Sequence, residues 1–156
     1  MFWKKNDNDD YSTPVQYLSI IDKFILKGSK ICDPFYNDGL VVREWKKIQR
    51  DIIHVNADFF ETEYDCDIFV SNPPFTIINK VLKKLFEIDK PFAMLMPIQK
   101  ICQLKVQKIM KNKNIQIVIC NIYIGFLKDG ERTRCPSQYF AWFCYKMNLP
   151  RDLNFV

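Results

Sequence analysis

The chain has 156 residues, 48% of them apolar and 15% aromatic, which predicts one folded domain and excludes a globally disordered chain. Its 23 Lys and Arg and 18 Asp and Glu give a net charge of +5, which permits a polyanionic partner without requiring one. No apolar run approaches the roughly 18 residues of a membrane-spanning helix, so we expect a cytoplasmic protein without a membrane anchor.

The first predicted elements are a flexible N-terminus and a helix. Residues 1–10 are polar and charged, and we expect them to be flexible. Thr13 followed by Pro14, with Gln16 three residues after Thr13, is typical of a capped helix start. Apolar residues at helical spacing continue this helix, and Gly28 predicts its end.

Strands and helices then alternate along the rest of the chain. We expect strands over residues 30–32, 51–55, 67–71, 92–96, 115–120 and 138–146, helices after residue 39 and over residues 77–86 and 99–111, and a loop over residues 123–137. This alternation predicts an α/β fold, with helices on both faces of a mostly parallel sheet. A single domain would then cover residues 11–156.

The cysteines and the one histidine argue against disulfides and metal. The six cysteines are Cys32, Cys66, Cys102, Cys120, Cys135 and Cys144. None forms a C-x-x-C motif and most lie in apolar runs, so we expect reduced, mostly buried thiols. His54 has no cysteine close to it in sequence, so we expect no metal site and favour a histidine hydrogen-bonded beside the sheet over a ligand contact.

Two loops have the position and composition of a ligand site. Residues 33–39 follow the first strand, and Asn72-Pro73-Pro74-Phe75 follows the strand at residues 67–71. Ligands of open α/β sheets bind beyond the carboxyl ends of the strands. Two successive prolines fix φ and donate no backbone hydrogen bond, so the Asn72 side chain and the neighbouring carbonyls are held rigidly. A rigid turn that only ends the strand is the alternative.

Asn72-Pro73-Pro74-Phe75 resembles the catalytic motif of S-adenosylmethionine-dependent N6-adenine DNA methyltransferases. Residues 33–39 resemble the cofactor loop of that family, and the Thr13-Pro14 segment resembles its N-terminal motif, in the same chain order. The resemblance implies a shortened Rossmann-like methyltransferase fold without a separate recognition domain. RNA and protein-glutamine methyltransferases use close relatives of the motif. Their glutamine-modifying members usually have Tyr at the last position, so Phe75 favours nucleic acid.

The resemblance assigns catalytic roles to the four residues of the motif. The adenine amine is a poor nucleophile because its lone pair is delocalised into the ring. The Asn72 amide oxygen and the Pro73 carbonyl would accept hydrogen bonds from its N–H groups, Pro74 would keep the motif rigid, and Phe75 would stack on the target base. That base must leave any duplex to reach the methyl donor. Positioning and electrostatics would carry the reaction, with no metal.

The same resemblance predicts that S-adenosylmethionine binds to Thr13, Pro14, Asp33, Pro34, Phe35, Asn37, Gly39, Asp58 and Phe59. Asn37 stands where the family usually has a glycine, and Asn tolerates left-handed backbone geometry better than most residues. Asp58 lies 19 residues after Gly39, near the spacing of about 20 in dinucleotide folds. A turn cap followed by two core phenylalanines is the alternative for Asp58. The segment between Gly39 and Asp58 is shorter than in larger methyltransferases, so we expect that a strand or helix has been lost there.

Basic residues offer a candidate contact for nucleic acid. Lys128, Arg132 and Arg134 lie in the loop after the strand at residues 115–120, and either contact nucleic acid or are simply exposed. The lysines on the predicted helices at residues 77–86 and 99–111 are expected to form solvated faces. We therefore expect methyl transfer to N6 of adenine in DNA, by an enzyme active inside the host cell of a phage or virus. RNA adenine, protein glutamine and a catalytically inactive binding relative are the alternatives. With no room for a recognition domain, sequence specificity is expected to be loose or to come from a homodimer or a specificity partner.

Overall fold

A computed structural model describes residues 11–134 and 138–156, so the expected flexible segment 1–10 and Cys135 lie outside the described residues. The described chain builds a seven-stranded sheet in the order β2-β1-β3-β4-β8-β5-β9. The strands are β1 (Ile31–Cys32), β2 (Ile52–Ile53), β3 (Ile68–Ser71), β4 (Phe92–Pro97), β5 (Ile115–Ile119), β8 (Phe140–Tyr145) and β9 (Leu153–Phe155).

Strand directions bring the ends of several strands to one edge of this sheet. β2, β1, β3 and β4 pair in parallel, and β5 pairs in parallel with β9. β8 lies between β4 and β5 and is antiparallel to both. The carboxyl ends of β1 to β5 therefore share an edge with the start of β8. The predicted mostly parallel sheet is confirmed.

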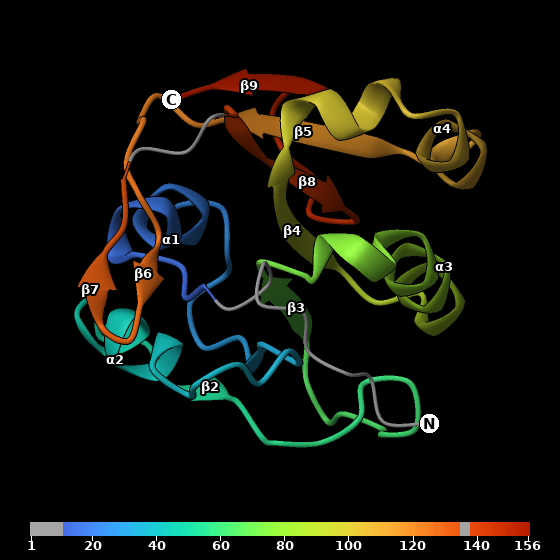
Figure 1. Ribbon diagram of the computed structural model, residues 1–156. Coiled ribbons are helices and arrows are strands. Elements are labelled where there is room, and N and C mark those ends of the chain that lie inside the picture. The colour runs from blue at the N-terminus through green and yellow to red at the C-terminus, as the bar shows by residue number, and fades with distance from the viewer. Residues whose placement is uncertain (1–10, 135–137) are drawn as a thin grey trace.

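Helices cover both faces of the sheet, as Figure 1 shows with α1 and α2 on one side and α3 and α4 on the other. The alternating side chains of β4 explain how the two cores form. Ala93 and Leu95 pack with α1 and α2, whereas Phe92, Met94 and Met96 pack with α3 and α4. Every β4 residue is therefore buried, which is why this strand is apolar throughout.

The first helix differs from its prediction at both ends. α1 covers Val15–Asp22 with Pro14 at its N-cap, so Thr13 is not the cap, and the helix ends well before Gly28. Glu44 of α2 (Val41–Lys46) instead accepts a hydrogen bond of 2.9 Å from the Val15 N–H. A buried carboxylate from the neighbouring helix thus satisfies a first-turn amide that sequence proximity assigns to Thr13.

The later helices follow the predicted apolar spacing more closely. A 3₁₀ turn η2 (Phe75–Ile77) leads into α3 (Ile78–Ile88), which buries the predicted stripe of residues 78, 81, 82, 85 and 86. The predicted helix over residues 99–111 is divided into a 3₁₀ turn η3 (Ile98–Cys102) and α4 (Leu104–Met110). Gln103 interrupts it with an extended backbone.

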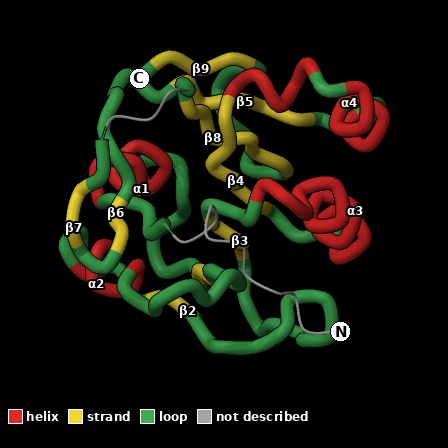
Figure 2. Tube along the Cα trace, viewed as in Figure 1, coloured by secondary structure: helices red, strands yellow, loops and turns green. Residues whose placement is uncertain are grey.

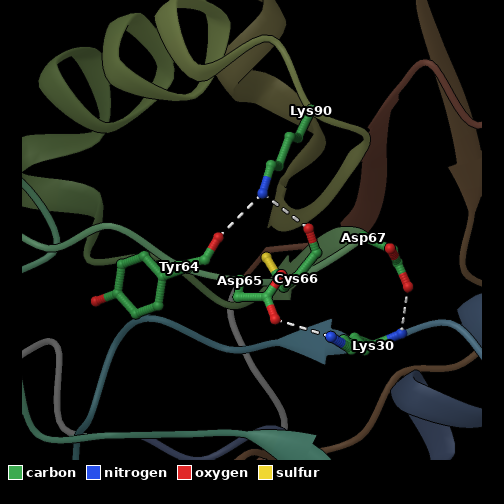
Figure 3. A network of polar contacts seen from close by, with 6 residues as sticks. All are labelled: Lys30, Tyr64, Asp65, Cys66, Asp67 and Lys90. Carbon is green, nitrogen blue, oxygen red and sulfur yellow. Dashed lines mark hydrogen bonds and ion pairs between the residues drawn. The ribbon is translucent and has the colours of Figure 1, made fainter.

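No helix or strand lies between β2 and β3, as the loop trace in Figure 2 shows. Figure 3 shows how the end of this connection is fixed between the starts of β1 and β4. Lys90 Nζ donates to the carbonyls of Tyr64 and Cys66, at 3.0 and 2.9 Å. Asp67 accepts a bond of 2.7 Å from the Lys30 backbone N–H. The segment between Gly39 and Asp58, from which we expect an element of larger methyltransferases to be missing, contains α2 and β2.

Two features of the C-terminal half are not predicted from the sequence. The predicted loop over residues 123–137 contains a hairpin of β6 (Leu127–Lys128) and β7 (Glu131–Arg132), although residues 135–137 lie outside the described chain. Beyond β8, Asn154 fixes β9 by donating to the carbonyls of Ile117 and Arg151. Within the described part of the chain, no helix has the length and apolarity needed to cross a bilayer.

Four of the five described cysteines are buried, namely Cys32, Cys66, Cys120 and Cys144, and Cys102 is exposed. The prediction of mostly buried thiols therefore holds for the described chain.

Candidate active site

A cavity of about 350 Å³ opens beyond the carboxyl ends of β1, β2 and β3. Its walls come from the segment before α1 and from the loops that follow these three strands. The volume lies in the range of small-molecule sites, and the position is the one at which α/β sheets bind ligands.

The cavity brings together nine of the residues that the sequence marks as a site. These are Thr13, Asp33, Pro34, Phe35, Asn37, Asp58, Phe59, Asn72 and Pro74. The remaining candidates, Pro14, Gly39, Pro73, Phe75, Lys128, Arg132 and Arg134, are not among its lining residues.

Other lining residues, including Tyr11, Ser12, Tyr36, Asp38, His54 and Ser71, have no assigned site role in the sequence analysis. Most of them are direct neighbours of motif residues. That adjacency at strand ends is the signal that would have found them.

Asn72 lines the cavity and carries an unused hydrogen-bond acceptor. It follows the last residue of β3, lines the cavity, and its Oδ1 is buried without a partner. Leaving such an atom unpaired costs about 1–3 kcal/mol, so it points to a group that arrives with a donor. Pro73 and Pro74, both buried, follow it and restrict the backbone.

Asp33 is a buried carboxyl at the base of the cavity, with 5% of its surface exposed. Its Oδ1 accepts hydrogen bonds from Ser71 Oγ at 2.5 Å and from the Phe35 N–H at 3.2 Å. Burial raises the pKa of Asp33 to about 6, and the neighbouring His54 and the two hydrogen bonds act in the opposite direction. A strongly perturbed carboxyl in a cleft is typical of functional sites.

His54 occupies the wall beside Asp33. Its Nδ1 lies 2.9 Å from the Asp33 carbonyl oxygen, which can only accept, so Nδ1 carries a proton. In the neutral ring, Nε2 is then an acceptor, and it is buried without a partner. Tyr36 stacks on the ring, with centroids 4.8 Å apart. The favoured hydrogen-bonded histidine is confirmed, and this histidine also lines the cavity.

Gly39 lies in the loop after β1, close to the ring of Tyr36. Its φ is +75°, and a Cβ placed there would lie 2.6 Å from Tyr36 Oη. The positive φ favours glycine, and a Cβ at this position would also displace the Tyr36 side chain. Asn37 is not among the described residues with positive φ. The left-handed conformation expected to make Asn tolerable there is thus not used.

Asp58 and Phe59 fit both interpretations that the sequence leaves open, a cofactor site and a turn cap followed by core phenylalanines. Asp58 Oδ1 accepts the Phe60 N–H at 2.8 Å, so it caps a turn, and it also lines the cavity. Phe59 is 3% exposed and contacts Phe35, with ring centroids 5.0 Å apart. The pair forms an aromatic wall that belongs both to the core and to the cavity.

The β6–β7 hairpin holds the N-terminal wall in place. Ser12 and Leu127 exchange backbone hydrogen bonds of 2.8 and 3.0 Å. Ser12 Oγ also donates to Asp38 Oδ1 at 2.8 Å, which ties this wall to the loop after β1. Lys128 Nζ lies 5.8 Å from the Tyr11 ring centroid, within cation–π range. Arg132 and Arg134 are exposed.

Phe75 lies at the start of η2 and is half-buried. Its ring contacts Phe140, with centroids 6.0 Å apart, and Lys100 Nζ lies 5.8 Å from the Phe75 centroid. The last residue of the motif therefore places an aromatic ring beside a cation.

Comparison with known proteins identifies the fold. No protein-family model and no curated protein matches the sequence. Precorrin-6y C5,15-methyltransferase from Geobacter metallireducens GS-15 superimposes with a TM-score of 0.55 at 10% identity, over 91% of this chain and 98% of that chain. Wild-type Trm5b from Pyrococcus abyssi gives a TM-score of 0.45 at 12% identity, over 87% of this chain and 50% of that chain. The chain has an α/β methyltransferase fold, as its sequence predicts.

Proposed function

We propose that the protein transfers a methyl group from S-adenosylmethionine to the exocyclic N6 amine of adenine in DNA. The fold shared with a methyltransferase supports the reaction class. The observation that carries the proposal is the buried, unpaired Oδ1 of Asn72 at the wall of the cavity.

The chemistry of an aromatic amine fits this acceptor. Asn72 Oδ1 and the Pro73 carbonyl would each accept one N–H of the adenine amine. Two acceptors draw the nitrogen from its planar form toward a tetrahedral one, which frees its lone pair for attack. Because both prolines restrict the backbone, the acceptors need little reorganisation during the reaction.

The cavity residues fit a cofactor of mixed polarity. S-adenosylmethionine supplies the methyl group in activated form, on a sulfonium. Asp33 and Asp58 offer carboxylates, and Phe35 and Phe59 offer an aromatic wall. The unpaired His54 Nε2 offers a further acceptor, which suits a ligand hydroxyl or amine. These residues would bind and orient the donor so that its methyl group faces Asn72.

The test is methyl transfer with labelled cofactor to adenine-containing DNA, to RNA of the same sequence and to protein. Digestion of each polymer then identifies N6-methyladenosine in its deoxy or ribo form. We expect the deoxy form. The ribo form would change the substrate to RNA, and label in protein alone would overturn the nucleic-acid substrate.

A matched pair of variants tests the role of Asn72. Asn72→Ala is expected to abolish methylation while calorimetry still detects S-adenosylmethionine binding. Asn79→Ala is the control, because Asn79 Oδ1 is also buried without a partner but Asn79 does not line the cavity. Equal activity of the two variants would overturn the role of Asn72. Absence of cofactor binding by the wild-type protein would overturn the reaction class.

A further inference from the structure

Two tyrosines form an exposed aromatic pair near the catalytic motif. Tyr123 follows β5 and is 43% exposed, and Tyr139 precedes β8 and is 66% exposed. Their ring centroids lie 5.0 Å apart with the planes inclined by 35°. Both residues lie at the sheet edge that carries the cavity. Exposed aromatic surface at the edge of a ligand site is a common sign of an interaction surface.

The backbone connects this pair to the motif. The Ile98 N–H donates to the Tyr139 carbonyl at 2.9 Å, which places Tyr139 beside η3 and its Lys100. Phe140, the next residue in the chain, contacts the ring of Phe75. Tyr139 is therefore linked by the backbone both to η3, which carries Lys100, and to the residue that contacts Phe75.

The positive charges near these rings favour a polyanionic partner, and two acidic residues of the hairpin offset part of that charge. Lys100 lies over Phe75 and Lys128 lies over Tyr11, so each cation accompanies an aromatic ring. Arg134 is exposed and follows β7. The hairpin tip also carries Asp129 and Glu131, and Glu131 lies opposite Lys128.

We propose that Tyr123 and Tyr139 form a stacking platform for an unpaired nucleotide that flanks the target adenine, so that the substrate is a single strand or an unpaired region. This inference rests on the proposed function, since it assigns the form of nucleic acid that reaches the same site.

A single strand is favoured over a duplex because its bases have faces that are free to stack on protein side chains. In a duplex the bases stack on one another, so an exposed ring pair gains nothing from them until they separate. In a single strand each base can stack on an aromatic side chain, and a moderate positive charge suffices to follow the backbone. The two ring–cation pairs, Phe75 with Lys100 and Tyr11 with Lys128, suit that mode of binding. An unpaired target base also avoids the cost of extrusion from a duplex.

Binding is tested by fluorescence anisotropy on short labelled oligonucleotides that contain adenine. The probes are a DNA single strand, the same strand annealed to its complement, and an RNA single strand of the same sequence. The wild-type protein is expected to bind the single strands at least about tenfold more tightly than the duplex. Tighter binding to the duplex would overturn the inference.

Variants separate stacking from folding. The double variant Tyr123→Leu and Tyr139→Leu is expected to weaken single-strand binding by about tenfold or more, whereas replacing both tyrosines by Phe retains binding. Lys100→Ala is expected to weaken binding further than Lys111→Ala, because the exposed Lys111 lies just before β5, at the opposite sheet edge. Circular dichroism checks that each variant is folded.

The outcomes also separate this inference from the proposed function. Equal binding by the Leu and Phe double variants would overturn the platform even if adenine is methylated. Single-strand binding that depends on the two rings, without methyl transfer, would support the platform and overturn the enzyme. Binding of an unstructured peptide but of neither oligonucleotide would overturn both.

Discussion

Ser71 Oγ donates a hydrogen bond of 2.5 Å to Asp33 Oδ1. It joins the last residue of β3 to the residue that follows β1, two neighbouring parallel strands. The residue after Ser71 is Asn72, so one contact couples the base of the cavity to the proposed catalytic amide. Asp33 and Asn72 are therefore linked through Ser71 alone.

Asp33→Asn is expected to stabilise the free protein near neutral pH. Burial raises the pKa of Asp33 from 3.8 to about 6, so the fold favours the neutral carboxyl. That contribution is complete below pH 3.8 and is lost as the pH rises to 6. At pH 7 the variant would gain about 1–3 kcal/mol in the free energy of unfolding, and the difference would vanish near pH 4.

Urea unfolding of both proteins across this pH range measures the effect. If the difference in the free energy of unfolding between variant and wild type stays constant from pH 4 to pH 7, the ionised Asp33 carboxylate does not destabilise the free protein. Under the proposed function, calorimetry would show weaker S-adenosylmethionine binding by the variant.

The two buried tryptophans of one core are expected to tolerate Phe differently. Trp45 and Trp142 are both fully buried in the cluster beneath α1 and α2. Trp142 Nε1 donates to the Tyr17 carbonyl at 3.1 Å, whereas Trp45 Nε1 has no partner. Trp142→Phe loses a hydrogen bond, and Trp45→Phe removes a buried unpaired donor. Chemical denaturation should give Trp142→Phe a free energy of unfolding about 1–2 kcal/mol lower than that of Trp45→Phe. The reverse order would contradict this account.

The network in Figure 3 predicts unequal roles for its two lysines. Lys90 is half-buried and bonds two carbonyls of the β2–β3 connection, so Lys90→Met is expected to cost about 1–3 kcal/mol. Lys30→Met removes only the exposed ion pair with Asp65 and keeps the backbone bond to Asp67. Little change in stability is expected for that variant. Thermal unfolding of the two variants compares them directly, and equal losses would argue against the role of Lys90.

Gly39→Ala tests the loop after β1. The new Cβ would meet Tyr36 and would also strain a backbone with φ of +75°. Gly28→Ala is the matched control, because Gly28 has φ of +84° but nothing within 4 Å of the added atom. Both variants are expected to lose about 1 kcal/mol from backbone strain, and Gly39→Ala additionally loses cofactor affinity. Identical behaviour in unfolding and in calorimetry would exclude a role for the Tyr36 contact.

Much of the fold follows from apolar patterning, because continuous apolar runs such as that of β4 admit few structures other than a covered strand. The β6–β7 hairpin escapes this reasoning because its strands are short and polar. Asp129 and Gly130 both have positive φ, so the Asp-Gly pair was the usable signal. The start of α1 was wrong because the group that satisfies its first turn, Glu44, is distant in sequence.

The part of the candidate site that lies in a sequence motif was predictable, and the part that depends on the pairing of strands was less so. Asn72 and Asp33 follow strands, and the rule for open sheets places them together. His54 and Tyr36 face the cavity only because β2 pairs beside β1, a relationship that no local pattern contains. The exposed Tyr123 and Tyr139 meet through β5 and β8, whose adjacency is likewise a property of the sheet order.

The position of β8 also determines how the chain must be assembled as it is synthesised. Both strand neighbours of β5 come later in the sequence, so β5 leaves the ribosome with no strand to pair with. β8 enters between two strands that precede it in the chain, and β9 then pairs with the remaining free side of β5. A nascent chain stalled before β8 would expose the open sides of β4 and β5, and these would be its main sites of aggregation.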